Sequence, residues 1–171
     1  MEEKRKRNLF PTILIITIPL MIIILVIIFF GIKNNNLHLA NNINDTGVNW
    51  DKYEGQEIVL SGSGKKVISA AGVYTLSGEL SDGYVEVNTT GAVKLILNGV
   101  SITNNSGPAI YVAEAKLVTV ETAAGSENVL MDGAIYSGWD EDVCATLFSH
   151  DDMVLQGSGT LTVNGNFEDG I

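Results

Sequence analysis

Residues 93–112 read VKLILNGVSITNNSGPAIYV, and this stretch decides the fold class. Val93, Leu95 and Leu97 alternate with residues that face the other way, and such alternation is typical of a β-strand rather than a helix. The asparagine–glycine pair that follows supplies the positive backbone φ of a tight turn. A second alternating run then begins, so the stretch predicts strand, corner and strand.

The same two features recur along the chain. Further alternating runs are centred on residues 85–87, 118–120 and 161–163. Turn sequences separate the runs: Asp82-Gly83, Asp132-Gly133, Gly157-Ser158-Gly159, Asn164-Gly165 and Asp169-Gly170. No segment after residue 33 shows a helical period. Residues 56–171 are therefore predicted to form one all-β domain, which is long enough to bury a core.

Two arrangements of these strands fit the pattern. Asn-Gly and Asp-Gly pairs between apolar runs usually indicate hairpins, and hairpins give an antiparallel sandwich. The chain also repeats itself weakly, because the segment 97–111 has an echo at 155–171. A repeat of this size favours a solenoid, in which each rung buries its inward residues against the next rung.

Three stretches resemble a bacterial family of surface carbohydrate-binding proteins that is typical of clostridia. They are residues 70–88 (AAGVYTLSGELSDGYVEVN), 93–112 and 145–171 (ATLFSHDDMVLQGSGTLTVNGNFEDGI). The resemblance covers residues 56–171 and implies a right-handed parallel β-helix, here of about five rungs. It also implies a truncated chain, because family chains continue for several more rungs.

The resemblance implies a function as well. Family members bind acidic plant polysaccharide such as polygalacturonate, and cellulose-type glycans, with calcium in the fold. They are regarded as binders, although their shape is similar to that of pectate lyases. We therefore expect a non-catalytic carbohydrate-binding protein that calcium assists. The alternatives are a pectate-lyase-like polysaccharide lyase, whose base would be Lys or Arg, and a structural or adhesive surface protein.

An uncharged run of 25 residues, from Asn8 to Ile32, determines where the domain is expected to work. A membrane-spanning helix needs about 20 apolar residues, and the basic residues before the run favour a cytoplasmic N-terminus. We predict a basic cytoplasmic tail (1–10), a transmembrane helix (11–32), a polar stalk (33–55) and an extracellular domain (56–171), held at the cell membrane by a single span. A cleaved secretion signal is the alternative, but the small residues of a cleavage site are missing.

Charge restricts the partners of the domain. No Lys or Arg follows Lys116, whereas ten Asp and Glu do. Such a surface cannot neutralise phosphates, which argues against nucleic acid as a partner. A polyuronate would also be repelled unless a cation bridged the two surfaces, so the predicted polyuronate binding requires calcium. The single cysteine, Cys144, excludes an internal disulfide.

Several acidic side chains lie in predicted corner loops, where their oxygens could ligate calcium. The candidate ligands are Asp140, Asp142, Asp151, Asp152 and Asp169. Solvated turns are the alternative interpretation, because the chain has no EF-hand spacing.

Two aromatic residues outside clean strand patterns, Trp139 and Tyr136, are the candidate sugar-binding residues. A sugar ring can stack its C–H face on an exposed aromatic ring, although Trp139 could instead fold back over the edge of a rung. Tyr111 and Phe148 lie in strand patterns and are expected to pack. No catalytic residue is predicted, because His150 has no accompanying nucleophile.

Overall fold

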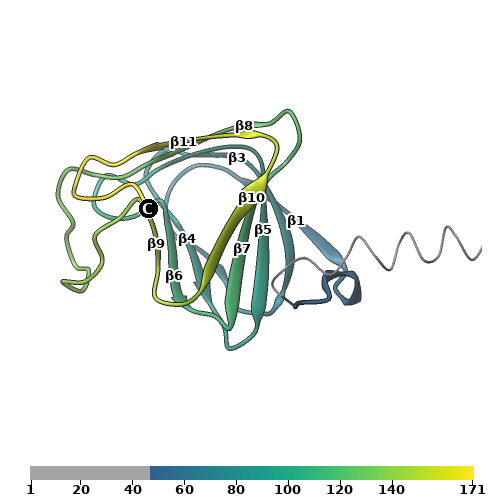
Figure 1. The fold of residues 1–171 in the computed structure, drawn as a ribbon. Coiled ribbons are helices and arrows are strands. Elements are labelled where there is room, and N and C mark those ends of the chain that lie inside the picture. The colour runs from purple at the N-terminus through teal and green to yellow at the C-terminus, as the bar shows by residue number, and fades with distance from the viewer. Residues whose placement is uncertain (1–46) are drawn as a thin grey trace, which may run out of the picture. The chain divides into compact units, whose positions relative to one another are not determined.

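The computed structural model describes residues 47–171, in which a compact unit runs from Trp50 to Ile171 (Figure 1). Within these residues the only helix is the 3₁₀ turn η1 (Trp50–Lys52), and no helix is long and apolar enough to cross a membrane. The predicted tail, the predicted transmembrane helix and most of the predicted stalk lie outside the described residues. The all-β prediction is confirmed for the described part of the chain.

Eleven strands follow η1 in chain order. They are β1 (Gly55–Leu60), β2 (Lys66–Ile68), β3 (Gly72–Leu80), β4 (Val85–Asn88), β5 (Ala92–Thr103), β6 (Ile110–Glu114), β7 (Leu117–Thr122), β8 (Glu127–Met131), β9 (Leu147–Ser149), β10 (Met153–Gly157) and β11 (Thr160–Asn164). The first sheet has the order β1-β3-β5-β7-β10, and the second has the order β2-β4-β6-β9. β8 pairs with the end of β5, and β11 pairs with β8.

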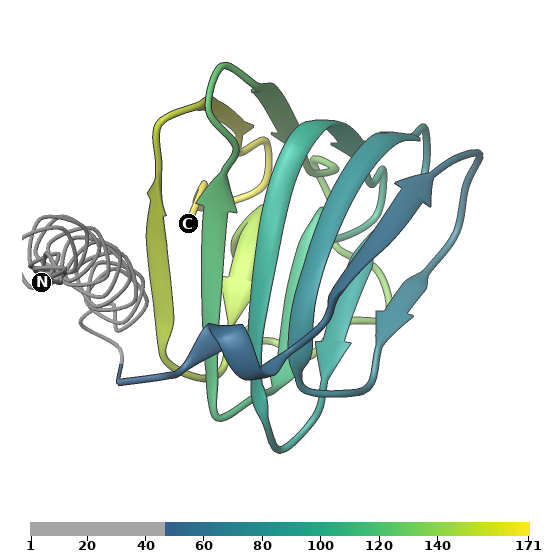
Figure 2. The same cartoon turned by 90° about the vertical axis from the view of Figure 1, so that its right-hand side faces the viewer.

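Every pair among these strands is parallel. The chain passes from the first sheet to the second and back, and each pass lies beside the previous one. Figure 2 shows the first sheet from its outer side, from β1 at one edge to β10 at the other. The prediction of parallel, stacked strands is confirmed, and the antiparallel sandwich is wrong.

Glycines allow the chain to turn the first corner, where the register between β3 and β5 shifts between Leu76 and Gly78. β3 and β5 bend at Gly78 and Gly99, whose φ angles are 89° and 77°. In a later pass Gly157, with a φ of 112°, ends β10 before β11 begins. A Cβ on Gly78 would lie 2.4 Å from the Leu60 carbonyl oxygen, and one on Gly157 would lie 2.3 Å from that of Thr122. The asparagine–glycine pair therefore marks a corner inside one bent strand rather than a hairpin.

In-register pairing places apolar side chains above one another in the core. In the first sheet Leu95 lies between Tyr74 and Val120, and all three are buried. The matching column of the second sheet consists of Val85, Ile110 and Leu147. Burying one such aliphatic side chain stabilises the fold by about 1.5–3 kcal/mol. The alternation in the sequence is therefore the pattern of inward and outward positions.

One buried polar side chain, that of Asn128, connects three passes at the first corner. Its Oδ1 accepts hydrogen bonds from the Gly99 and Val100 N–H groups, at 3.0 and 3.1 Å. Its Nδ2 donates to the Thr160 carbonyl at 3.0 Å and to Ser126 Oγ at 2.8 Å. Asn128 is only 1% exposed, which limits the competition of water for these bonds.

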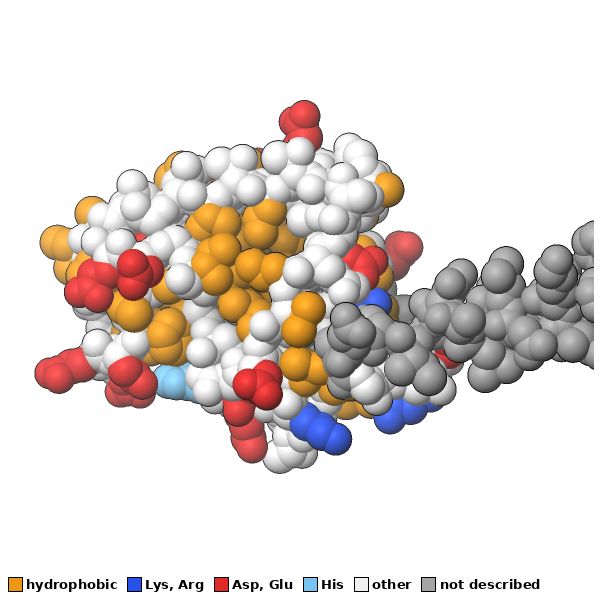
Figure 3. Space-filling view, viewed as in Figure 1, with side chains coloured by type: hydrophobic (Ala, Val, Ile, Leu, Met, Phe, Trp, Pro, Cys, Tyr) orange, Lys and Arg blue, Asp and Glu red, His pale blue; other side chains and the backbone are white. Residues whose placement is uncertain are grey.

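The end of the unit formed by β9, β10 and β11 presents apolar side chains to solvent. Figure 3 shows apolar side chains in the middle of this end and acidic side chains along part of its rim. Leu155 is 45% exposed and Ile171 is 56% exposed. No further strand covers them within the described residues.

The connection from β8 to β9, residues 132–146, is called the corner loop below. It is the longest connection between strands in the described part of the chain. The loop begins against the preceding pass, because a Cβ on Gly133 would lie only 2.0 Å from the Asn105 carbonyl oxygen. It ends at a parallel bridge between Ala145 and Asp169. Both ends are thus fixed, and the residues between them lie beside the second sheet.

Replacing Asn128 by Ala should destabilise the unit by about 2–4 kcal/mol, because the buried Val100 N–H and the partly buried Gly99 N–H lose their acceptor. Urea unfolding of residues 50–171 measures this change. Asn88→Ala is the matched control, because Asn88 is exposed. Equal unfolding free energies for the two variants would contradict the role given to Asn128.

Candidate functional site

An aromatic cluster covers the outer side of the second sheet. Its members are Tyr84, Tyr111, Tyr136, Trp139, Phe148 and Phe167. The register of the sheet aligns Glu86, Tyr111 and Phe148 on neighbouring strands. Since Ile110 and Leu147 face the core, the residues after them must face outward. Tyr111 and Phe148 therefore do pack, as expected, but on the surface and not in the core.

Trp139 of the corner loop is the centre of this cluster. Its ring meets Tyr84 edge to face, with 4.9 Å between ring centroids, and meets Tyr111 likewise at 5.0 Å. The indole also lies on the backbone of Gly107, where a Cβ would come within 2.1 Å of Nε1. The structure thus places Trp139 back over the corner, which is the alternative that the sequence left open. Its ring is still only half-buried.

A pocket of about 250 Å³ opens beside Trp139. Its lining residues are Tyr84, Asn104, Ser106, Ser137, Gly138 and Trp139. The Ser137 N–H donates to the Ser106 carbonyl at 3.1 Å, which joins the loop to the corner below it. Asn104 is buried, and its Nδ2 donates to the Pro108 carbonyl at 2.7 Å. The pocket therefore combines aromatic walls with a hydrogen-bonded floor.

Tyr136 has a supporting role in this arrangement. Its ring stacks on Phe167, with 4.5 Å between centroids and an interplanar angle of 21°. Its hydroxyl donates to Asp132 Oδ2 at 2.9 Å, and Asp132 Oδ1 accepts from the Asn166 N–H at 2.6 Å. Burial of the phenol, and then its hydrogen bond to Asp132, raise the pKa of Tyr136. Tyr136 thus positions the loop that carries Trp139.

Asp132 is the organising residue that the sequence did not reveal. It is only 3% exposed, and its backbone carbonyl also accepts a hydrogen bond from Asn166 Nδ2 at 2.9 Å. By its sequence alone, Asp132-Gly133 indicates an ordinary turn. A buried carboxylate with two donors anchors the corner loop to the next pass, and no local pattern announces that role.

The predicted calcium ligands do not converge. Asp151 Oδ2 accepts a hydrogen bond from the Ala115 N–H at 2.7 Å, and Asp142 Oδ2 lies 3.6 Å from His150 Nδ1. Asp140, Asp152 and Asp169 are exposed. Within residues 47–171 no group of three or more His, Cys, Asp or Glu side chains is placed to hold a metal ion. Calcium assistance therefore stays a prediction.

His150 connects the corner loop to the strands through ring and polar contacts. Its Nε2 lies 3.3 Å from the Tyr111 hydroxyl, and its ring meets Phe148 edge to face at 4.9 Å. Burial first, and then the charge of Asp140, raise the pKa of Tyr111. The partner of His150 is Asp142 rather than the adjacent Asp151. His150 thus belongs to the aromatic cluster as a supporting residue.

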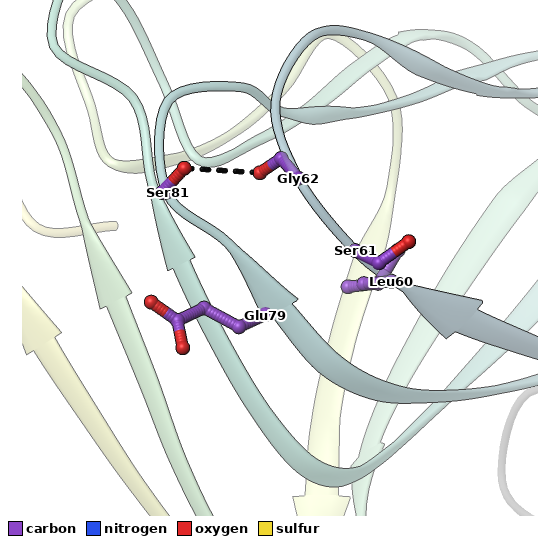
Figure 4. Close-up of a pocket in the computed structure, with 5 residues that line it drawn as sticks. All are labelled: Leu60, Ser61, Gly62, Glu79 and Ser81. Carbon is purple, nitrogen blue, oxygen red and sulfur yellow. Dashed lines mark hydrogen bonds between the residues drawn. The ribbon is translucent and has the colours of Figure 1, made fainter.

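A second pocket, of about 350 Å³, lies between the first two passes. Figure 4 shows Glu79, Ser81 and the segment from Leu60 to Gly62 around it. Ser81 Oγ donates to the Gly62 carbonyl at 3.1 Å. No aromatic ring lines this pocket, so it offers a sugar no stacking surface.

The chain is similar to known proteins over most of its described part. A family model described as carbohydrate-binding domain-containing protein matches residues 63–171. A carbohydrate-binding domain-containing protein of Acetivibrio thermocellus is 35% identical over 147 residues, which cover 82% of this chain and 50% of that protein. The solved structure of a polysaccharide lyase-like protein from C. thermocellum, a gadolinium derivative, has a TM-score of 0.61 and 38% sequence identity, and the match covers 63% of this chain and 45% of that one. This chain thus spans about half the length of these relatives.

Tyr136→Phe tests the anchoring of the corner loop. The folded chain holds the Tyr136 proton more tightly than the unfolded chain, whose tyrosine pKa is 10.0. This contribution to the unfolding free energy is complete below that value and decreases as the pH rises above it. The variant should be less stable by about 1–3 kcal/mol near neutral pH, because buried Asp132 loses a donor, and its stability should decline less above about pH 10. Urea unfolding over this pH range measures both effects, and an unchanged profile would contradict the assignment.

Proposed function

The chain belongs to the carbohydrate-binding domain-containing protein family, and we propose that it binds a polysaccharide through the aromatic cluster without cleaving it. The observation that carries this proposal is the pocket that Tyr84 and Trp139 line on one side. An aromatic wall suits the C–H face of a sugar ring, and adjacent polar groups suit its hydroxyls.

A neutral, cellulose-type glycan fits this surface better than a polyanion does. Asp140, Glu141 and Asp142 are exposed on the corner loop that carries Trp139. A uronate carboxylate near them would be repelled unless a cation stood between. Calcium could supply that bridge, but the described side chains form no group of three that would hold it. Polyuronate binding with calcium is therefore the second candidate, supported by the family resemblance and tested below.

The proposal of a binder rather than a lyase rests on the lack of a suitable base beside the aromatic cluster in the described part of the chain. β-Elimination needs a group that can accept the C5 proton. Lys65 lies 2.9 Å from Glu86 Oε2 at the margin of the cluster. The hydrogen bond to Glu86 raises the pKa of Lys65, which keeps its ammonium protonated and unfit as a base.

The finer description of the fold is also a proposal. The parallel passes are arranged as we expect of a right-handed parallel β-helix, and the lyase-like neighbour supports this interpretation. Residues 11–32 would anchor the domain in the cell membrane and display it outside the cell.

Protease added to intact cells that carry the full chain should remove the domain and leave a short stub in the membrane fraction, because the domain is expected to lie outside. Immunoblotting of cells and medium measures this. Release of the protein into the medium with an N-terminus near Asn41 would show a cleaved signal instead.

Calorimetry of the full chain with cellohexaose and with oligogalacturonate tests the function. Cellohexaose should bind equally with calcium and with chelator, and Tyr84→Ala should weaken binding about tenfold through the loss of an aromatic wall. Tyr53→Ala, outside the cluster, is the matched control.

Three results would change this account. Binding of neither glycan would refute the proposed function. Calcium-dependent binding of oligogalacturonate alone would favour the second candidate. A rise in ultraviolet absorbance from unsaturated product would show a lyase.

A further inference from the structure

The rings around Trp139 do not share a plane. The plane of Trp139 is inclined by 68° to that of Tyr84, by 76° to that of Tyr111 and by 53° to that of Tyr136. A flat, crystalline glycan surface presents many sugar rings in one plane, so a protein that binds it by stacking needs coplanar aromatic rings. The aromatic rings of this cluster are instead steeply inclined to one another.

The cluster has two near-parallel pairs, and neither is parallel to Trp139. Tyr111 and Phe148 stack with 6.2 Å between centroids and an interplanar angle of 20°. Tyr136 and Phe167 stack on each other at 4.5 Å, so each ring covers one face of the other. Tyr111, on the other side of Trp139, meets the indole and the His150 ring edge to face. The rings are thus used largely in contacts with one another.

The pocket is small enough to select a single sugar unit. Its volume of about 250 Å³ is below the roughly 300–1,000 Å³ of pockets that take drug-sized ligands. The hydroxyls of Ser106 and Ser137 make no hydrogen bond within the described residues, and both side chains are exposed at its mouth. Gly138, with a φ of 81°, forms the exposed tip of the loop beside them.

From this geometry we infer that the pocket takes one terminal sugar unit of a glycan, at a chain end or a side branch, and that the domain does not bind flat crystalline glycan faces. The inference rests on the proposed function and specifies its ligand. Tyr84 and Trp139, which contact each other edge to face, together form one aromatic wall against the sugar ring, and Ser106 and Ser137 bond its hydroxyls. The remainder of the glycan extends into solvent over the loop tip.

Chain length distinguishes this mode of binding from an extended one. The full chain in detergent is titrated with cellobiose, cellotriose and cellohexaose, and its retention on crystalline cellulose is measured separately. If only a terminal sugar unit binds, the three oligosaccharides should have affinities within about twofold of one another. If the site is a platform or a groove, the affinity should rise about tenfold or more with chain length, because further sugar units make contact. If cello-oligosaccharides fail but a branched glucan binds, the terminal unit belongs to a side branch.

Two variants complete the test. Ser137→Phe fills the pocket from an exposed position and should abolish binding of every oligosaccharide, while Ser69→Phe, at an exposed position outside the pocket, should leave binding unchanged. Affinity that rises steeply with chain length, retention on crystalline cellulose, or normal binding by Ser137→Phe would overturn the inference and leave the proposed function intact. Failure of all glycans to bind would refute the proposed function itself.

Discussion

Parallel, in-register stacking of the strands is the constraint on which the rest of the structure depends. A shift of one residue in any strand would exchange its inward and outward side chains. The register that buries Ile110 and Leu147 in the core is the same register that places Tyr111 and Phe148 on the outer surface. Glycines let successive passes approach closely at the corner, because a side chain at Gly78 or Gly157 would collide with the preceding backbone. The same strand register therefore determines both the core and the aromatic cluster.

The corner loop adds what the repeated passes cannot provide. Residues 132–146 bring Trp139 against Tyr84 and Tyr111. The loop holds its position through a buried carboxylate, that of Asp132, and through backbone bonds to the preceding pass. A rigid scaffold with a functional loop fixed to it is a common way to build a binding site.

The sequence predicted the repeated elements well because their signal is local. Alternation identified the strands, and the internal echo favoured parallel stacking over hairpins. The sequence pattern could not show that Tyr111 faces outward. Apolar residues flank Tyr111 on both sides, so either face of the strand could have been the core face. The role of Asp132 depends on Asn166, which is 34 residues away and leaves no trace in a local pattern. The acidic residues were grouped by type, but Asp151 serves the Ala115 N–H instead of a shared ion.

The central claim is that a sugar enters the pocket beside Trp139. The chain has two tryptophans, and Trp50 is only 6% exposed and outside the aromatic cluster, so it is an internal reference. The most direct measurement is the pair of indole N–H signals in a ¹⁵N–¹H NMR spectrum during titration with cellotriose. The account predicts that the Trp139 signal moves with saturation while the Trp50 signal stays in place. A Trp139 signal that does not move when calorimetry shows the sugar to be bound would contradict it.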